Sequence, residues 1–332
     1  MHRAALSALA LLVLLLALGA PSTARAMTTC TASMTPLAFG SITDPATPST
    51  TTATLAVRCD TTISLGLLAR VKVRMCLGIG NATQPRTMSD GGSHGLNFQI
   101  YKEAARTNIW GTRGGTPGAV LLDMEYDVLL TGGKSQNITV YAATPSQSAA
   151  WAGSYSADYA LSTALDYRYD EPLTVVPVPY PDTCTTGGAG GATNRPFGFT
   201  VSASVPPSCT LLTGSDLDFG PHPGPIAAVY DNSTTLSVQC RGGTPWTLSL
   251  DNGKYFDSGT RRMRIDGTDS YVRYGLYHDT GRSLPWGQSA GDTLAGSGTG
   301  ALDTRTVYGR VPSGQNVPAG IYSDTITATI TY

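Results

Sequence analysis

The sequence has 332 residues, with 22 Lys or Arg against 23 Asp or Glu, so its formal net charge is −1. A chain with this balance and no block rich in Lys and Arg is a poor candidate for binding nucleic acid or anionic membrane surfaces. Gly, Thr, Ser and Pro are plentiful, and few stretches repeat apolar residues at a helical spacing, which favours extracellular β-structure.

Residues 1–26 have the pattern of a secretory signal peptide. His2 and Arg3 give a basic start, residues 4–18 are apolar, and Ala24-Arg25-Ala26 has the spacing of a cleavage site. Cleavage there would make Met27 the first residue of the mature chain. No later apolar run reaches the roughly 18 residues of a membrane-spanning helix, so we expect an exported chain without a transmembrane segment.

The cysteines predict disulfides, because all six lie after the predicted cleavage site and an even number is typical of bonded exported chains. A metal site is the alternative, but the sequence has no C-x-x-C pair and only three His beyond residue 26. We therefore expect no metal site and no cofactor. The predicted disulfide residues are Cys30, Cys59, Cys76, Cys184, Cys209 and Cys240.

The exported part contains one pattern twice. Each copy runs from a cysteine to Phe-Gly, continues to a second cysteine, and later shows a Tyr followed nine residues on by Trp-Gly. Near the end of each copy comes V-Y-x-x-x-P and then A-G-x-Y-S. The repeat divides the chain into a signal peptide (1–26), an N-terminal domain (27–183), a linker with a strand-like segment (184–208) and a C-terminal domain (209–332).

The repeat also predicts the disulfide pairing. It matches Cys30 and Cys59 with Cys209 and Cys240, so that each copy contains one bond. Cys76 and Cys184 have no counterpart in the second copy, and we pair them with each other. Short strand-like segments separated by Gly, Pro, Asn and Asp predict an all-β fold of two tandem immunoglobulin-like antiparallel β-sandwiches.

The last residues of the sequence alternate strictly between apolar and Thr side chains. Ile326, Ala328, Ile330 and Tyr332 share one face, and the Thr residues between them share the other. This period of two predicts a half-buried strand. An edge strand with an apolar face and no Pro is an aggregation hazard when it is left uncovered, so we expect another chain to cover it.

These landmarks resemble the spore coat protein U domain, the building block of archaic (Csu-type) chaperone–usher pili. The resemblance rests on the paired cysteines, Phe-Gly, the Tyr…Trp-Gly hairpin, V-Y-x-x-x-P and the closing A-G-I-Y-S-D-T-I-T-A-T-I-T-Y. It extends over nearly all of residues 209–332, whereas the first copy matches only at the landmarks and carries extra sequence.

The resemblance implies sandwiches that lack a final strand. A periplasmic pilus chaperone lends that strand, and the N-terminal extension of the next pilin subunit later replaces it. It therefore implies that the C-terminal domain lacks its final strand and docks through Ile326, Ala328, Ile330 and Tyr332. The implied partners are the chaperone, the outer-membrane usher and the next pilin subunit.

The resemblance also implies a position at the pilus tip. A shaft pilin has an alternating apolar extension before its first cysteine, but only Met27, Thr28 and Thr29 separate the predicted cleavage site from Cys30. A donor-like stretch lies instead inside the chain, with apolar residues at Phe197, Phe199, Val201, Ala203 and Val205. We expect it to complete the first domain after a flexible loop at 185–194; the alternative is that it begins the second domain.

Three apolar stretches of the first domain are candidate adhesive loops, since exposed apolar patches mark interaction surfaces. The alternative is that these residues belong to the core of irregular strands. The Pro-rich stretch is the most suggestive, because Pro is excluded from central strands. The residues are Leu65, Leu67, Leu68, Val120, Leu121, Leu122, Val176, Pro177, Val178 and Tyr180.

No enzymatic motif is present: the sequence lacks a G-x-S-x-G elbow, a P-loop and an H-E-x-x-H motif. The sequence and the resemblance together predict a tip adhesin, exported through the periplasm to the cell surface, that attaches to hydrophobic surfaces and promotes biofilm formation. The alternatives are a secreted coat or matrix protein that polymerises without adhering, and a lectin that binds a sugar.

Overall fold

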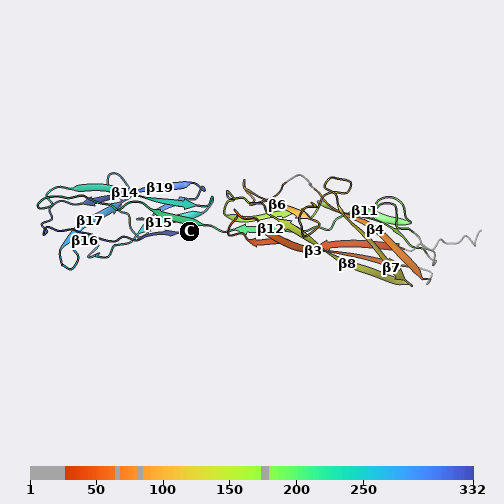
Figure 1. Ribbon diagram of the computed structural model, residues 1–332. Coiled ribbons are helices and arrows are strands. Elements are labelled where there is room, and N and C mark those ends of the chain that lie inside the picture. Colours follow the sequence, from red (N-terminus) through yellow and green to blue (C-terminus); the bar gives the residue numbers. More distant parts are fainter. Residues whose placement is uncertain (1–26, 64–67, 81–84, 173–178) are drawn as a thin grey trace, which may run out of the picture.

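The computed structural model describes residues 27–63, 68–80, 85–172 and 179–332. Within these residues the chain forms twenty strands and no helix. The strands build two β-sandwiches placed end to end, so that the molecule is an elongated rod (Figure 1). The predicted all-β fold is therefore confirmed. The predicted signal peptide lies outside the described residues.

The first domain contains two sheets. One has the strand order β1-β3-β8-β6-β5-β9-β12-β2, and the other has the order β11-β10-β4-β7. All pairings are antiparallel except the parallel contact of β12 with β2. The strands are β1 (Met27–Met34), β2 (Leu37–Ser41), β3 (Thr50–Thr62), β4 (Ala69–Ile79), β5 (Arg86–Ser89), β6 (Gly95–Tyr101), β7 (Val120–Val128), β8 (Thr131–Ala143), β9 (Gly153–Asp158), β10 (Thr163–Asp170), β11 (Gly190–Arg195) and β12 (Thr200–Val205).

The second domain repeats this plan with fewer strands. Its sheets have the orders β13-β14-β19-β17-β16 and β18-β15-β20. The strands are β13 (Cys209–Thr213), β14 (Tyr230–Cys240), β15 (Pro245–Leu250), β16 (Arg261–Arg264), β17 (Tyr271–Tyr277), β18 (Leu294–Ser297), β19 (Leu302–Val311) and β20 (Ala328–Thr331).

Side-chain alternation explains both cores. In β3, Ala53, Leu55 and Val57 are buried while the residues between them face outward, as expected of strands with one face on a core. The first domain has one large buried cluster that draws on all of its sheets. The buried cluster of the second domain is smaller and is surrounded by many apolar residues that are only partly buried.

The three predicted disulfides are confirmed. Cys30 bonds Cys59, and Cys209 bonds Cys240, each across the first two paired strands of its domain. The third bond joins Cys76 in β4 to Cys184. It fastens the segment between β10 and β11 to the smaller sheet of the first domain.

Replacing both Cys76 and Cys184 with Ala is expected to destabilise the first domain. The bond spans 108 residues, and a loop of that length contributes about 4–5 kcal/mol in the chain-entropy account of disulfides. Urea unfolding followed by near-ultraviolet circular dichroism would measure the change. Leu161→Ala is a suitable control because Leu161 is 92% exposed and is not part of the buried cluster at the bond, which consists of Cys76, Ala119 and Cys184. An unchanged unfolding midpoint would contradict the expectation.

For one candidate adhesive stretch the structure has the strand alternative, and one expectation about a segment is wrong. Val120, Leu121 and Leu122 belong to strand β7, paired with β4, and not to a loop. The predicted flexible loop at 185–194 ends early, because residues from Gly190 onward form β11 beside β10. The glycines permit this close pairing: a Cβ on Gly191 would lie 2.2 Å from the Tyr167 carbonyl oxygen. A Gly-rich segment can therefore be a strand where another backbone approaches closely.

Candidate functional site

The donor-like stretch lies in the first domain. Strand β12 is inserted between β9 and β2, with Val201 opposite Ala157 on one side and Leu37 on the other. The alternating apolar residues Phe197, Phe199, Val201, Ala203 and Val205 are all at most 6% exposed. Residues 190–205 therefore belong to the first domain, and the predicted alternative, in which this stretch begins the second domain, is not what the structure has.

An aromatic stack anchors the start of this segment. The rings of Phe197 and Phe199 lie nearly parallel to Trp110, with centroids 6.1 and 6.5 Å away. Phe199 also stacks on Tyr159 at 4.8 Å, and the Tyr159 amide donates a hydrogen bond to the Phe199 carbonyl. Aromatic pairs add about 0.5–1.5 kcal/mol beyond their burial, so this segment is firmly held.

Equivalent hydrogen bonds in the two domains show which of their residues correspond. The Tyr155 hydroxyl donates to the Trp151 carbonyl at 2.8 Å, and the Tyr322 hydroxyl donates to the Pro318 carbonyl at the same distance. The indole nitrogen of Trp110 donates to Leu77, and that of Trp286 donates to Leu248. Residues 320–325 of the second domain therefore correspond to β9 of the first.

In the second domain no described residues occupy the position that corresponds to β12. Ser323 pairs with Arg264 on one side, as Ser156 pairs with Ser89 in the first domain. No described strand pairs with the opposite edge of residues 320–325. Likewise β20 pairs with β15, but no described strand lies where β11 accompanies β10.

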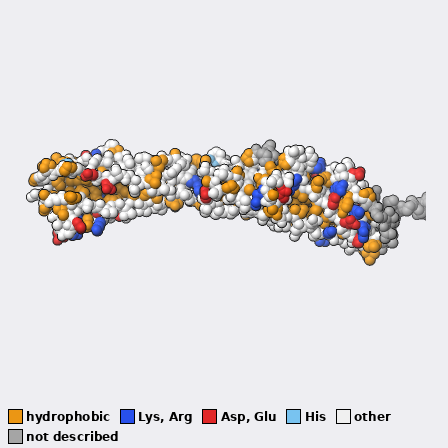
Figure 2. Space-filling view, viewed as in Figure 1, with side chains coloured by type: hydrophobic (Ala, Val, Ile, Leu, Met, Phe, Trp, Pro, Cys, Tyr) orange, Lys and Arg blue, Asp and Glu red, His pale blue; other side chains and the backbone are white. Residues whose placement is uncertain are grey.

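The core along this empty edge is open. Leu37 and Tyr155 of the first domain are 0% and 2% exposed, whereas their counterparts Leu217 and Tyr322 are only partly buried. Figure 2 shows apolar side chains gathered in a hollow at the end of the second domain away from the first. We call the surface along residues 320–325 and β20 the open groove; its partly buried residues are Leu217, Phe219, Tyr322, Ile326, Ala328 and Ile330.

The predicted docking strand has the expected alternation but is shorter than expected. Ile326, Ala328 and Ile330 are half-buried against the second core, and the Thr residues between them are exposed. Only Ala328–Thr331 forms a regular strand, with Ile330 opposite the buried Leu248. Tyr332 is 56% exposed. The prediction of a strand that extends from Thr325 to Tyr332 is therefore wrong in its length.

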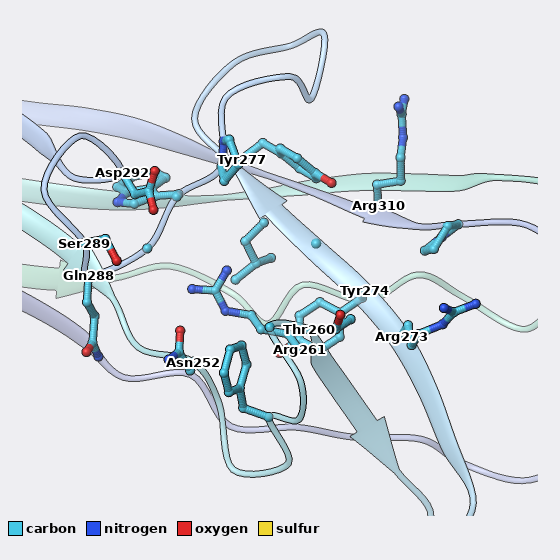
Figure 3. Close-up of a pocket in the computed structure, with 18 residues that line it drawn as sticks. Asn252, Thr260, Arg261, Arg273, Tyr274, Tyr277, Gln288, Ser289, Asp292 and Arg310 are labelled. Atoms are coloured by element: carbon cyan, nitrogen blue, oxygen red, sulfur yellow. The ribbon is translucent and has the colours of Figure 1, made fainter.

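A cavity of about 620 Å³ opens beside β17 in the same domain (Figure 3). Its lining is mostly polar and includes Asn252, Gln288, Ser289 and Asp292. The Arg261 side chain points into it and donates hydrogen bonds to the carbonyls of Leu250 and Asp251. In the first domain Gln99 stands where Gly275 lies here, and its buried side chain bonds Arg86.

Buried polar groups secure the wall of the groove. The Tyr274 hydroxyl donates to the Asp324 carboxylate at 2.7 Å, and burial together with that carboxylate raises the pKa of Tyr274. Asp324 also accepts from the backbone amides of Lys254 and Thr325. These bonds fix residues 320–325 as an ordered edge, so the groove has a defined wall.

A second surface lies at the far end of the first domain, and we call it the apolar pole. Leu68, Leu129 and Leu130 are between 55% and 58% exposed. They gather because Ala69 pairs with Val128 and the Ile63 amide bonds the Leu130 carbonyl. Figure 2 shows apolar atoms at this end of the rod. Below them Glu171 is half-buried beside Thr28, and burial raises the pKa of its carboxyl group.

The predicted adhesive residues do not all meet at this pole. Leu68 lies there, whereas Tyr180 lies on the β4–β7 sheet under Lys72 and Arg74, whose charged groups are 5.1 and 5.6 Å from its ring. Leu121 is 76% exposed but sits opposite Cys76, away from the pole. Leu65, Leu67, Val176, Pro177 and Val178 lie outside the described residues. Sequence reasoning missed Leu129 and Leu130, although two adjacent leucines directly before the sequence Thr-Gly-Gly, which begins β8, could have indicated them.

The sequence profile of the Spore Coat Protein U domain matches residues 18–159 and 196–329. The chain belongs to this family. Protein U of Myxococcus xanthus is 35% identical over 144 residues, which cover 39% of this chain and 80% of that protein. The profile matches twice, so this spore coat protein U domain protein carries the domain twice. The first match ends before β10, and the second begins just ahead of β12, the strand that the structure places in the first sandwich.

Two solved structures span most of this family member at low identity. One is the CsuC–CsuE chaperone–tip adhesion subunit pre-assembly complex from the archaic chaperone–usher Csu pili of Acinetobacter baumannii, 17% identical, with a TM-score of 0.44, covering 92% of this chain and 100% of that one. The other is the CupB6 tip adhesin from Pseudomonas aeruginosa, 10% identical, with a TM-score of 0.33, covering 91% and 94%.

This spore coat protein U domain protein belongs to a family of structural subunits and not of enzymes. Across residues 27–63, 68–80, 85–172 and 179–332, no three His, Cys, Asp or Glu side chains form a group that could hold a metal ion. In the same residues no helix is long and apolar enough to cross a membrane.

Proposed function

We propose that this protein is a tip adhesin of a chaperone–usher pilus. The observation that carries the proposal is the difference between its two domains. The first contains its own strand along residues 190–205, and the second is open at the same place. A domain that is open on one side binds a strand from another chain by β-augmentation, in which backbone pairing gives affinity and side-chain alternation gives register.

The first domain serves as a template for the bound strand. Residues 190–205 run antiparallel to β9 and β10, so a strand in the groove would run antiparallel to residues 320–331. The periplasmic chaperone supplies this strand first. The next subunit supplies it later, and the exchange of one strand for the other takes place at the outer-membrane usher. The first domain needs no donor, because its own strand fills that place; it therefore stands at the free end.

Co-expression with a periplasmic chaperone, followed by size-exclusion chromatography and N-terminal sequencing, tests this assignment. A stable one-to-one complex is expected, together with a mature chain that begins at or near Met27. A stable free monomer, equally abundant without the chaperone, would overturn the proposal. It would favour the alternative that the family name suggests, a secreted coat or matrix protein that polymerises without adhering.

The apolar pole is the proposed contact with hydrophobic surfaces, from which attachment and biofilm formation follow. Changing Leu68, Leu129 and Leu130 together to Asp is expected to reduce retention of the protein on polystyrene by at least about tenfold, since each buried leucine contributes about 1.5–3 kcal/mol. Binding would be measured by quartz-crystal microbalance. Leu161→Asp is the matched control, because Leu161 is 92% exposed away from the pole.

Equal retention of the triple variant and the wild type would exclude this surface as the adhesive contact. If soluble glycans inhibited adhesion while binding to polystyrene stayed unchanged, the result would instead support the lectin alternative.

A further inference from the structure

The connection between the two domains is short and stiff. Strand β12 ends at Val205 and β13 begins at Cys209, so only Pro206, Pro207 and Ser208 lie between them. Proline fixes its own φ and restricts the residue before it. Domains joined in one chain are still expected to move unless their contact is firm, so the side chains at the junction decide whether the rod bends.

Arg241 of the second domain ties this connection down. Its backbone amide donates to the Ser208 carbonyl at 2.9 Å. Its guanidinium donates to the Pro206 carbonyl and, at 3.0 Å, to the Thr43 carbonyl of the first domain. One residue therefore holds both the linker and the body of the first domain, and bonds from a charged donor are stronger than neutral ones.

Trp151 of the first domain packs on the next two residues of the second. A Cβ on Gly242 would lie 2.6 Å from Cε2 of the indole, and one on Gly243 would lie 3.1 Å from Cε3. The Ala152 amide donates to the Gly242 carbonyl at 2.8 Å. The indole therefore lies against bare backbone, a contact that any side chain at Gly242 would prevent.

A second ring holds the indole in place. The His94 imidazole stacks on Trp151 with centroids 3.8 Å apart and planes 16° apart, and its Nδ1 lies 2.9 Å from the Asp90 carboxylate. The register of the repeat matches Trp151 with Pro318 and His94 with Ser270 in the second domain. The stack therefore belongs to this junction and is not a general feature of the fold.

We propose that Trp151, braced by His94 and seated on Gly242 and Gly243, is a clamp that locks the two domains into one rigid rod. The clamp transmits a load on the first domain to the second without bending at the linker. The proposal does not depend on what the first domain binds or on what fills the open groove.

Small-angle X-ray scattering of the full chain, in the oligomeric form in which it purifies, tests the clamp. The wild-type profile is expected to fit one rigid conformer. Trp151→Ala and Gly242→Ala should each lose that fit and require a broader distribution of radii of gyration. Adding Gly242→Ala to Trp151→Ala should change nothing further, because the indole with which the new Cβ collides is gone.

Melting temperatures and near-ultraviolet circular dichroism would show that both domains remain folded in each variant. Leu161→Ala is the control for an unrelated surface change. The proposal would be overturned if both single variants scattered like the wild type, or if the two substitutions had independent, additive effects on the distribution. If Trp151→Ala fails to fold, the scattering profile of Gly242→Ala by itself tests the clamp: a profile like that of the wild type would overturn the proposal.

Discussion

Val201→Asp is expected to leave the first domain unfolded. Val201 is 0% exposed in the middle of β12, between β9 and β2. An unpaired carboxylate at such a position costs several kcal/mol, a large share of the roughly 5–15 kcal/mol that stabilise a domain. Thermal unfolding of the full chain, followed by circular dichroism, should lose the transition of the first domain and keep that of the second.

Ser202→Asp is the matched control for this change. Ser202 is the next residue of the same strand, but it is exposed, so its variant should melt close to the wild type. Equal melting of Val201→Asp and Ser202→Asp would show that β12 contributes little to the first domain, and it would remove the basis for using that domain as a template for the groove.

Ile330→Asp is expected to abolish recovery of a chaperone complex. Ile330 lies on the apolar face of β20, opposite Leu248, and borders the open groove. A charge there would face the side chains of any strand laid along the groove and would stay desolvated without a partner. Affinity chromatography on the tagged chaperone should recover little of the variant, and immunoblots of the periplasm should show its degradation.

Thr329→Asp provides the comparison for Ile330→Asp, since Thr329 is exposed on the opposite face of the same strand. It should be recovered with the chaperone nearly as well as the wild type. Secretion of Ile330→Asp as a normal free monomer would contradict the docking role of the groove. A loss of both variants alike would indicate a general folding defect instead.

The sequence was most informative where a period or a repeat carries the signal. The repeat predicted the bonds Cys30–Cys59 and Cys209–Cys240, because strands in equivalent places bring equivalent cysteines together. The bond Cys76–Cys184 was predicted because these two cysteines were the ones left without a counterpart in the repeat. Alternation predicted the buried face of the segment from Phe197 to Val205. Both signals depend on side-chain type alone, so they can be read without knowing which segments lie side by side in the fold.

Features that depend on a close approach between distant segments could not be read in this way. Gln147 pairs its side-chain amide with the backbone of Asn97, and Gln315 does the same with Arg273, so each acts as a short piece of strand. Nothing in the spacing of a lone glutamine predicts this. The Gly-rich β11 was missed for the opposite reason, since composition indicated a loop and only the contact with β10 makes it a strand.

The built-in strand also has a consequence for how the first domain folds. Strand β12 pairs with β2 from the opposite end of the domain's sequence, and contacts between distant residues form late because the intervening loop must first be closed. A chain that emerges N-terminus first can form β1 to β10 while the places of Phe197, Phe199 and Val201 are still vacant. Until Val205 is available, such an intermediate exposes apolar core and unpaired edges, which makes it prone to aggregation and proteolysis. A nascent first domain therefore resembles, for a time, the second domain in its finished form.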